Sequence, residues 1–173
     1  MGDIVGIKKW HISGFIFVSI LGVLFHFAYK FFENGSFWGY FFPVNESIWE
    51  HLKLIFWPSV IFMIPEYVCI GKTVPDYFSV KASSLFVSAS FIVSAYYTYS
   101  GILGFNLLGA DLLLFFIGVF ICEYMSCSLI ATVDQYAKSD NFRGIALLVF
   151  FAICFIFWTY NPPSLGIFWG WNA

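Results

Sequence analysis

Charged side chains are scarce in this chain: Asp, Glu, Lys and Arg make up 10% of its 173 residues. Soluble domains carry about 25% charged residues. With 8 basic and 10 acidic side chains, the chain cannot cover the surface of a soluble globule, which excludes a soluble enzyme. A net charge of −2 excludes a nucleic-acid-binding protein that works through a basic surface. The composition therefore indicates a membrane protein.

Sequence signatures of common catalytic sites are absent as well. The chain has no His-Glu-x-x-His, Gly-x-Ser-x-Gly, Walker or dinucleotide glycine pattern. No Cys-x-x-Cys pair occurs, so we expect neither a disulfide nor a thiolate metal site. The four cysteines are instead expected to pack as small apolar residues; they are Cys69, Cys122, Cys127 and Cys154.

Long hydrophobic stretches are abundant, and 61% of the residues are hydrophobic. A membrane-spanning helix needs about 20 mainly apolar residues. The pattern predicts an all-α, polytopic transmembrane bundle that forms a single integral membrane domain over residues 1–173. We expect about five spans, at residues 12–32, 46–70, 81–99, 107–135 and 144–160, with Pro58 and Pro65 kinking the second. The Gly- and aromatic-rich segment 33–45 is predicted to lie at the membrane interface.

Basic residues are distributed unequally between the two sides of this topology. Cytoplasmic segments of membrane proteins are enriched in Lys and Arg. The N-terminus is therefore predicted inside and the tail 161–173 outside, in a multi-pass protein of the cell membrane. On the inner side this topology puts Lys8, Lys9, Lys72, Lys81, Lys138 and Arg143, against Lys30 and Lys53 on the outer side.

The densest group of polar residues occupies positions 45–53, at the outer start of the second span. Asn45 is predicted to cap the helix, with Glu46 in its first turn. Glu46 and Glu50 are four residues apart and share one helix face, and Lys53 is close enough to pair with Glu50.

His26 is predicted to lie at a similar depth near the outer end of the first span. Together, His26, His51, Glu46 and Glu50 would form a divalent-cation site, with zinc as the candidate cofactor. The alternative is a helix start with a dipole-matched acid, a Glu–Lys pair and an interfacial Trp49, which explains His26 less well.

Glu123 falls near the middle of the fourth span, where a charge is costly in free energy. We expect no Lys or Arg at its depth, so Glu123 is predicted to be protonated. Its hydrogen-bond partners would be serines of the span 81–99, or it would face a wet cavity. Glu66, near the inner end of the second span, is predicted to reach the inner interface.

Two segments resemble a group of small bacterial integral membrane proteins of unknown function. Members carry F-x-P-V-N-E-S-x-W-E-H-x-K after the first span, which here is residues 41–53, and T-[FY]-x-P-P after the last, which here is residues 159–163. The tail departs from the charged ending of the group, because it reads Phe-Trp-Gly-Trp at positions 168–171. The resemblance implies that segment 33–53 and the tail belong to one outer-face site, and it implies no activity.

The leading functional hypothesis is a small-solute or ion-binding membrane protein, either a transporter or a transporter's substrate-binding subunit. In this hypothesis Trp38 and Trp49 line an outer mouth together with tryptophans of the tail, and Glu46 and Glu50 select charge. Glu123 would couple transport to protons. The ligand would be a cationic or aromatic small molecule.

Two alternatives belong to other classes. The first is a metal-dependent intramembrane enzyme that acts on a lipid or lipid-linked substrate at the outer leaflet. The second is a membrane scaffold subunit without chemistry of its own, in a homo- or hetero-oligomer. Its signature would be small residues such as Ser84 and Ser88 on a face that the chain leaves unpaired.

Overall fold

A computed structural model describes residues 4–132 and 141–170, and every regular element in these ranges is helical. Five helical stretches are long and apolar enough to cross a membrane, which confirms the predicted all-α class with about five spans. The α-helices are α1 (Ile4–Phe31), α2 (Ile48–His51), α3 (Lys53–Cys69), α4 (Tyr77–Leu103), α5 (Leu108–Thr132) and α6 (Asn141–Tyr160). Three 3₁₀ turns lie between and after them: η1 (Trp38–Tyr40), η2 (Gly71–Thr73) and η3 (Gly166–Phe168).

The second span begins two residues later than expected and is divided into α2 and α3. Ser47, and not Asn45, caps it, because the Ser47 hydroxyl accepts a hydrogen bond from the amide of Glu50 at 3.3 Å. The Asn45 side chain instead accepts from the amide of Ser47 at 2.9 Å. The break falls at Leu52. Both prolines of this span remain inside α3.

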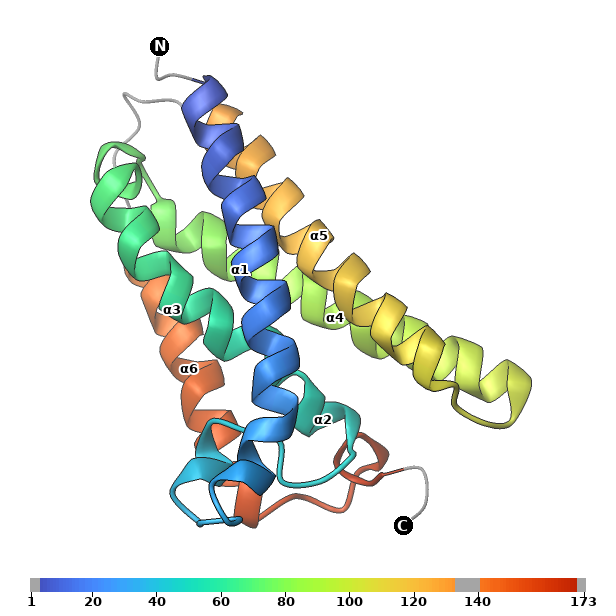
Figure 1. The fold of residues 1–173 in the computed structure, drawn as a ribbon. Helices are drawn as coiled ribbons and strands as arrows, with labels where there is room; N and C mark the ends of the chain where they lie inside the picture. Colours follow the sequence, from blue (N-terminus) through green and yellow to red (C-terminus); the bar gives the residue numbers. More distant parts are fainter. Residues whose placement is uncertain (1–3, 133–140, 171–173) are drawn as a thin grey trace.

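The long helices form one bundle and pack against one another in the order α3, α1, α5, α4 and α6 (Figure 1). α1 packs against α3 and α5, and α4 packs against α5 and α6. The connection between α4 and α5 projects away from the other helices, while segment 33–47, α2 and η3 gather at the opposite end from the N-terminus. We call the end with the N-terminus, at the top of Figure 1, the N-terminal end, and the other the C-terminal end.

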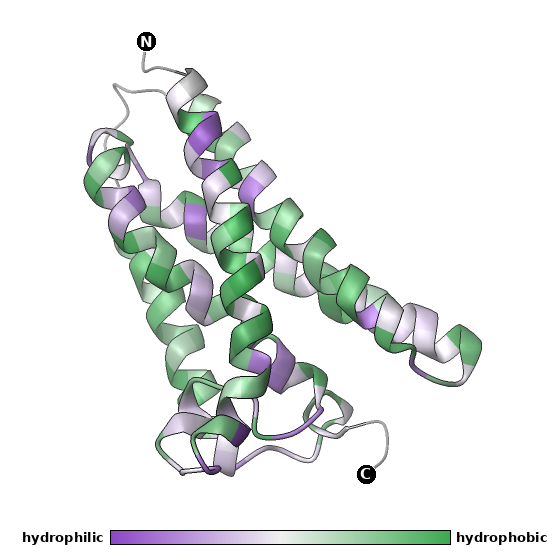
Figure 2. Cartoon of the chain, in the orientation of Figure 1, coloured by the Kyte–Doolittle hydropathy of each residue, from purple (hydrophilic) through white to green (hydrophobic). Residues whose placement is uncertain are grey.

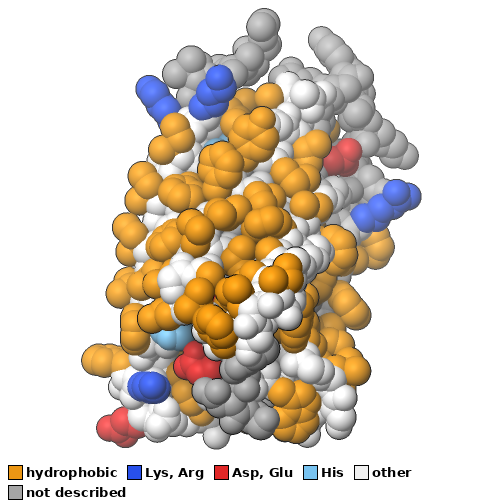
Figure 3. Space-filling model, turned by 90° about the vertical axis from the view of Figure 1, so that its right-hand side faces the viewer, with side chains coloured by type: hydrophobic (Ala, Val, Ile, Leu, Met, Phe, Trp, Pro, Cys, Tyr) orange, Lys and Arg blue, Asp and Glu red, His pale blue; other side chains and the backbone are white. Residues whose placement is uncertain are grey.

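The surface is apolar over the length of the helices. Figure 2 shows hydrophobic residues along every long helix, with hydrophilic positions at the ends and at a few interior points. On the face in Figure 3, hydrophobic side chains cover the middle and charged side chains lie toward the two ends. Large side chains such as Leu24 and Ile64 are more than half exposed, as expected for a surface in contact with lipid.

Small residues allow neighbouring helices to approach closely. The Ser88 hydroxyl donates to the carbonyl of Gly118 at 2.6 Å, and a side chain at Gly118 would overlap Ile92. Ser84 and Ser88 are fully buried inside the chain, so these two positions do not form an unpaired lipid-facing surface. Gly144 on α6 lies against the backbone of Phe78, where a β-carbon would overlap main-chain atoms.

Candidate functional site

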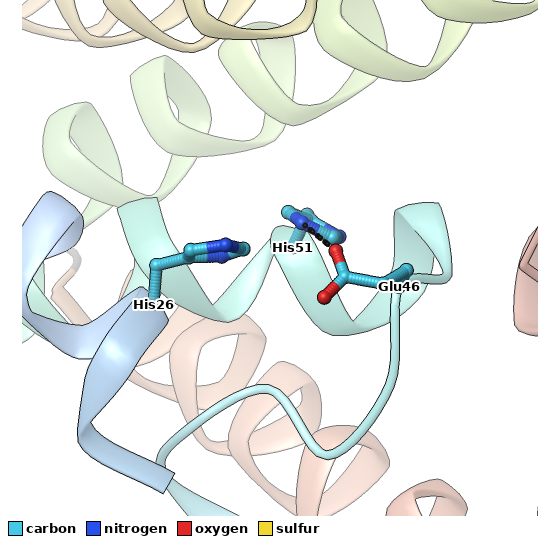
Figure 4. A group of neighbouring side chains, drawn as sticks. All are labelled: His26, Glu46 and His51. Atoms are coloured by element: carbon cyan, nitrogen blue, oxygen red, sulfur yellow. Dashed lines mark ion pairs between the residues drawn. The ribbon is translucent and has the colours of Figure 1, made fainter. Parts of the chain in front are cut away.

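Two histidines and one carboxylate converge at the C-terminal end. His26 comes from the last turns of α1, His51 ends α2, and Glu46 comes from the segment that precedes α2 (Figure 4). The His51 Nε2 atom lies 3.3 Å from the Glu46 Oε2 atom, and the two imidazole centroids are 5.3 Å apart. Each residue offers one ligand atom, and these three atoms lie within 4.8 Å of one another. We call these residues the His26–Glu46–His51 group.

The orientation of the His51 ring is set by a main-chain contact. Its Nδ1 atom lies 2.8 Å from the carbonyl oxygen of Ser47. Because a carbonyl only accepts hydrogen bonds, Nδ1 carries the proton of the neutral ring, and Nε2 then keeps its lone pair. Histidines that bind metals typically donate their other ring N–H to a carbonyl or carboxylate in this way.

The group opens to the surrounding solvent. The Glu46 side chain is 71% exposed and the His51 side chain 30% exposed. When the His51 ring is protonated at both nitrogens, its Nε2–H donates to the Glu46 carboxylate, and this hydrogen bond holds the pKa of Glu46 below its usual range, although partial burial acts in the opposite direction. The Glu46 carboxylate is therefore ionised at neutral pH.

Glu50 belongs to a different, buried group. The predicted ion pair with Lys53 is confirmed: the Lys53 ammonium lies 2.6 Å from the Glu50 carboxylate, and both side chains are almost completely buried. Lys53 also donates to the carbonyl of Gly39 at 2.8 Å and to the hydroxyl of Thr159 at 2.7 Å. The amide of Val44 donates to the Glu50 carboxylate at 3.0 Å. Of the four residues predicted to bind a metal, the structure thus brings three together and pairs the fourth with a lysine.

The tryptophans predicted to line the outer mouth differ in burial and in packing partners. Trp49 is only 8% exposed and packs against Phe155, with ring centroids 4.8 Å apart, inside the hydrophobic core. Trp38 stacks on Phe32 at 4.3 Å in the segment after α1. Trp169 is 55% exposed, and Trp171 lies outside the described residues.

A second convergence of ionisable residues lies toward the N-terminal end, where Figure 2 shows hydrophilic positions among apolar ones. The His11 Nδ1 atom lies 2.7 Å from the Glu123 carboxylate and 3.6 Å from the Glu66 carboxylate. The Lys81 ammonium lies 2.9 Å from Glu66 and 3.6 Å from Glu123. The Tyr77 hydroxyl donates to Glu66 at 2.7 Å. We call the four charged or titratable side chains His11, Glu66, Lys81 and Glu123 the buried ionic group.

Comparison with known proteins identifies a family for this chain but no activity. A family model described as a family of unknown function (DUF6512) matches residues 2–171. The chain belongs to this family. No curated protein matches the chain, and no solved structure matches it. Both convergences of ionisable residues lie within the part of the chain that defines it as a member of DUF6512.

The structure corrects the expectations for Glu123 and Glu66. Glu123 has a basic neighbour, Lys81, and it contacts His11 rather than a serine of α4. The reason is that α4 begins at Tyr77, four residues before the expected start, so Lys81 lies one turn inside the helix and 1% exposed. Glu66 is completely buried and does not reach the interface.

Sequence reasoning missed His11 altogether. The position directly follows the basic and aromatic start of the first helix, so it reads as part of an interfacial segment. The signal that could have found it is that two acids within the spans, Glu66 and Glu123, require partners of opposite charge.

One basic residue of the predicted topology cannot be compared with the structure. Lys138, which the sequence assigns to the inner side, lies outside the described residues.

Proposed function

We propose that this membrane protein binds a divalent transition-metal ion, with zinc as the preferred ion, at the His26–Glu46–His51 group. The observation that carries the proposal is the convergence of two imidazoles and one carboxylate, each with a ligand atom within 4.8 Å of the others. Two nitrogen ligands and one carboxylate oxygen are a typical ligand set of zinc sites with catalytic function. The hydrogen bond from His51 Nδ1 to Ser47 supports it, because it leaves Nε2 free to bind the ion.

Three protein ligands leave one coordination position of a tetrahedral zinc ion open. A zinc ion in such a site activates water or polarises a carbonyl or phosphoryl oxygen. Glu46 is exposed, so the open position is accessible from the membrane surface. We therefore infer a metal-dependent activity on a lipid or lipid-linked substrate at the end of the bundle that the basic residues assign to the outside.

Metal analysis of the purified protein tests the binding step. We expect protein stripped with a chelator and reloaded with zinc to retain about one equivalent after desalting. His51→Ala and His26→Ala should each weaken binding by more than the roughly 10- to 100-fold that loss of an outer-shell partner costs. The matched control is Glu33→Gln, an exposed acid at the same end. Far less than one equivalent of zinc in the wild-type protein would refute the proposal.

A second candidate function is transport of the ion, and one observation favours it. His11 lies 15 residues before His26 on α1, and Glu66 lies 15 residues after His51 on the antiparallel second span. At 1.5 Å per residue, the buried ionic group is about 22 Å from the metal-binding group, a large part of a hydrocarbon core of about 30 Å. Ionisable groups near both faces of a membrane suit a protein that moves ions.

Zinc flux into proteoliposomes separates the two functions. A transporter would load vesicles with zinc, and both His51→Ala and Glu123→Gln would reduce the flux. An enzyme would bind zinc with no flux above that of protein-free vesicles. Neither candidate function uses the outer mouth of acidic and aromatic side chains that the small-solute hypothesis requires, because Trp49 and Glu50 are buried.

A further inference from the structure

The buried ionic group brings together four titratable side chains where water is scarce. Each of His11, Glu66, Lys81 and Glu123 is at most 4% exposed as a residue, and they come from α1, α3, α4 and α5. Two carboxylates and one ammonium carry a net charge of −1 while the imidazole is neutral, and zero once it is protonated. An uncompensated charge in the interior of a membrane protein is costly in free energy. The charge balance therefore depends on a single proton.

The group already contains its own cation. The Lys81 ammonium lies between the two carboxylates, 2.9 Å from Glu66 and 3.6 Å from Glu123. A metal ion that bridged these carboxylates would have to take the same space and would meet a like charge. The ligand that fits the remaining negative charge is a proton.

One atom of the group is available to receive it. His11 Nδ1 lies 2.7 Å from the Glu123 carboxylate, which only accepts hydrogen bonds, so Nδ1 carries the proton of the neutral ring. The Nε2 atom is buried and has no hydrogen-bond partner among the described residues. A neutral His11 therefore keeps an unused lone pair at Nε2, while its Nδ1 atom faces the two carboxylates.

We propose that the buried ionic group is a proton-binding site in which His11 Nε2 takes up one proton. A new N–H bond forms at Nε2, the proton comes from water at the N-terminal end, and the charge of the group changes from −1 to zero. The imidazolium is then stabilised by Glu123 and Glu66, at 2.7 Å and 3.6 Å from Nδ1. This site is independent of metal binding at the C-terminal end.

Other titratable groups around His11 do not supply the missing charge. Tyr77 on α4 donates its hydroxyl to Glu66. Cys122 is buried next to Glu123 on α5, and Cys127 lies one turn farther along the same helix. Lys8 on α1 is exposed and lies near Cys127.

Nitrogen NMR of the histidine-labelled protein in lipid nanodiscs, stripped of metal, tests the proposal directly. The chain has three histidines, so His11→Gln assigns the His11 signals. We expect these signals to change from a neutral ring protonated at Nδ1 to an imidazolium as the pH is lowered from 9 to 5. A ring that keeps one protonation state over this range would overturn the proposal, with no variant required.

Charge variants identify the cause. Glu123→Gln makes the group neutral without the proton, so the ratio of protonated to neutral His11 at a given pH should fall at least about tenfold, as is typical for removal of a charge within 4–6 Å. Glu33→Gln, an exposed acid at the other end of the bundle, is the matched control and should leave the ratio unchanged. An unchanged ratio in Glu123→Gln would overturn the proposal, as would the infrared band of a protonated carboxyl appearing in place of the imidazolium. Loss of zinc binding with an intact His11 titration would refute only the metal site.

Discussion

Removal of the Lys53 ammonium is expected to destabilise the protein more than any other single lysine change at the C-terminal end. Lys53→Met keeps most of the aliphatic side chain and deletes the charge. The side chain is 0% exposed, and its ammonium joins three parts of the chain: Glu50 in α2, Gly39 in η1 and Thr159 in α6. Its loss leaves the Glu50 carboxylate, 2% exposed, with a described hydrogen bond only from the amide of Val44.

The expected magnitude follows from this geometry. Breaking a buried ion pair by removal of one partner costs about 3–5 kcal/mol, because the remaining charge is uncompensated. Replacing both partners is far less costly, since no charge is then left behind. The double variant Lys53→Met/Glu50→Gln should therefore be more stable than Lys53→Met alone.

Equilibrium unfolding in mixed micelles, followed by helix content, measures these differences. The matched control is Lys72→Met, whose lysine is exposed in η2 and whose loss should change the free energy of unfolding by no more than about 0.5 kcal/mol. If Lys53→Met is as stable as the wild type, the ion pair does not hold α2, η1 and α6 together. If the double variant is less stable than Lys53→Met, the uncompensated carboxylate is not the source of the loss.

Four further outcomes are expected. Gly144→Ala should lower the free energy of unfolding by at least about 1–3 kcal/mol in the same assay, because its methyl group would overlap the backbone of α4, whereas Gly109→Ala, with open space around it, should not. Tyr77→Phe should cost about 1–3 kcal/mol, since it removes a buried hydrogen bond to the Glu66 carboxylate, and a stability equal to the wild type would contradict that contact. Zinc affinity, followed by titration calorimetry, should fall as the pH is lowered, because an imidazole that takes up a proton loses the lone pair that binds the ion. The pKa of Glu46 is lowered, so its carboxylate stays ionised below its usual range, and Glu46→Gln should weaken zinc binding; an unchanged zinc affinity would show that Glu46 is not a ligand.

The candidate site could be predicted only where neighbours along the chain form it. The Glu50–Lys53 pair follows from a spacing of three residues, and the structure confirms it across the break between α2 and α3. The approach of His26 to His51 depends on how α1 and α2 are rotated about their axes, which spacing along one helix does not reveal. Glu50 shares a helix face with Glu46 in a continuous helix, but α2 begins after Glu46, so the two carboxylates point to different partners.

The sequence by itself determined the number of helices that can cross the membrane and the all-helical class. This information is local, because every backbone hydrogen bond in lipid has to be satisfied within a continuous apolar helix. Only the tertiary structure decided which ionisable side chains meet. His11 and Glu123 are 112 residues apart, and their contact arises because α1 packs against α5. A charge buried among helices is stabilised by partners from other helices, so the two groups of ionisable residues emerge only when the bundle is assembled.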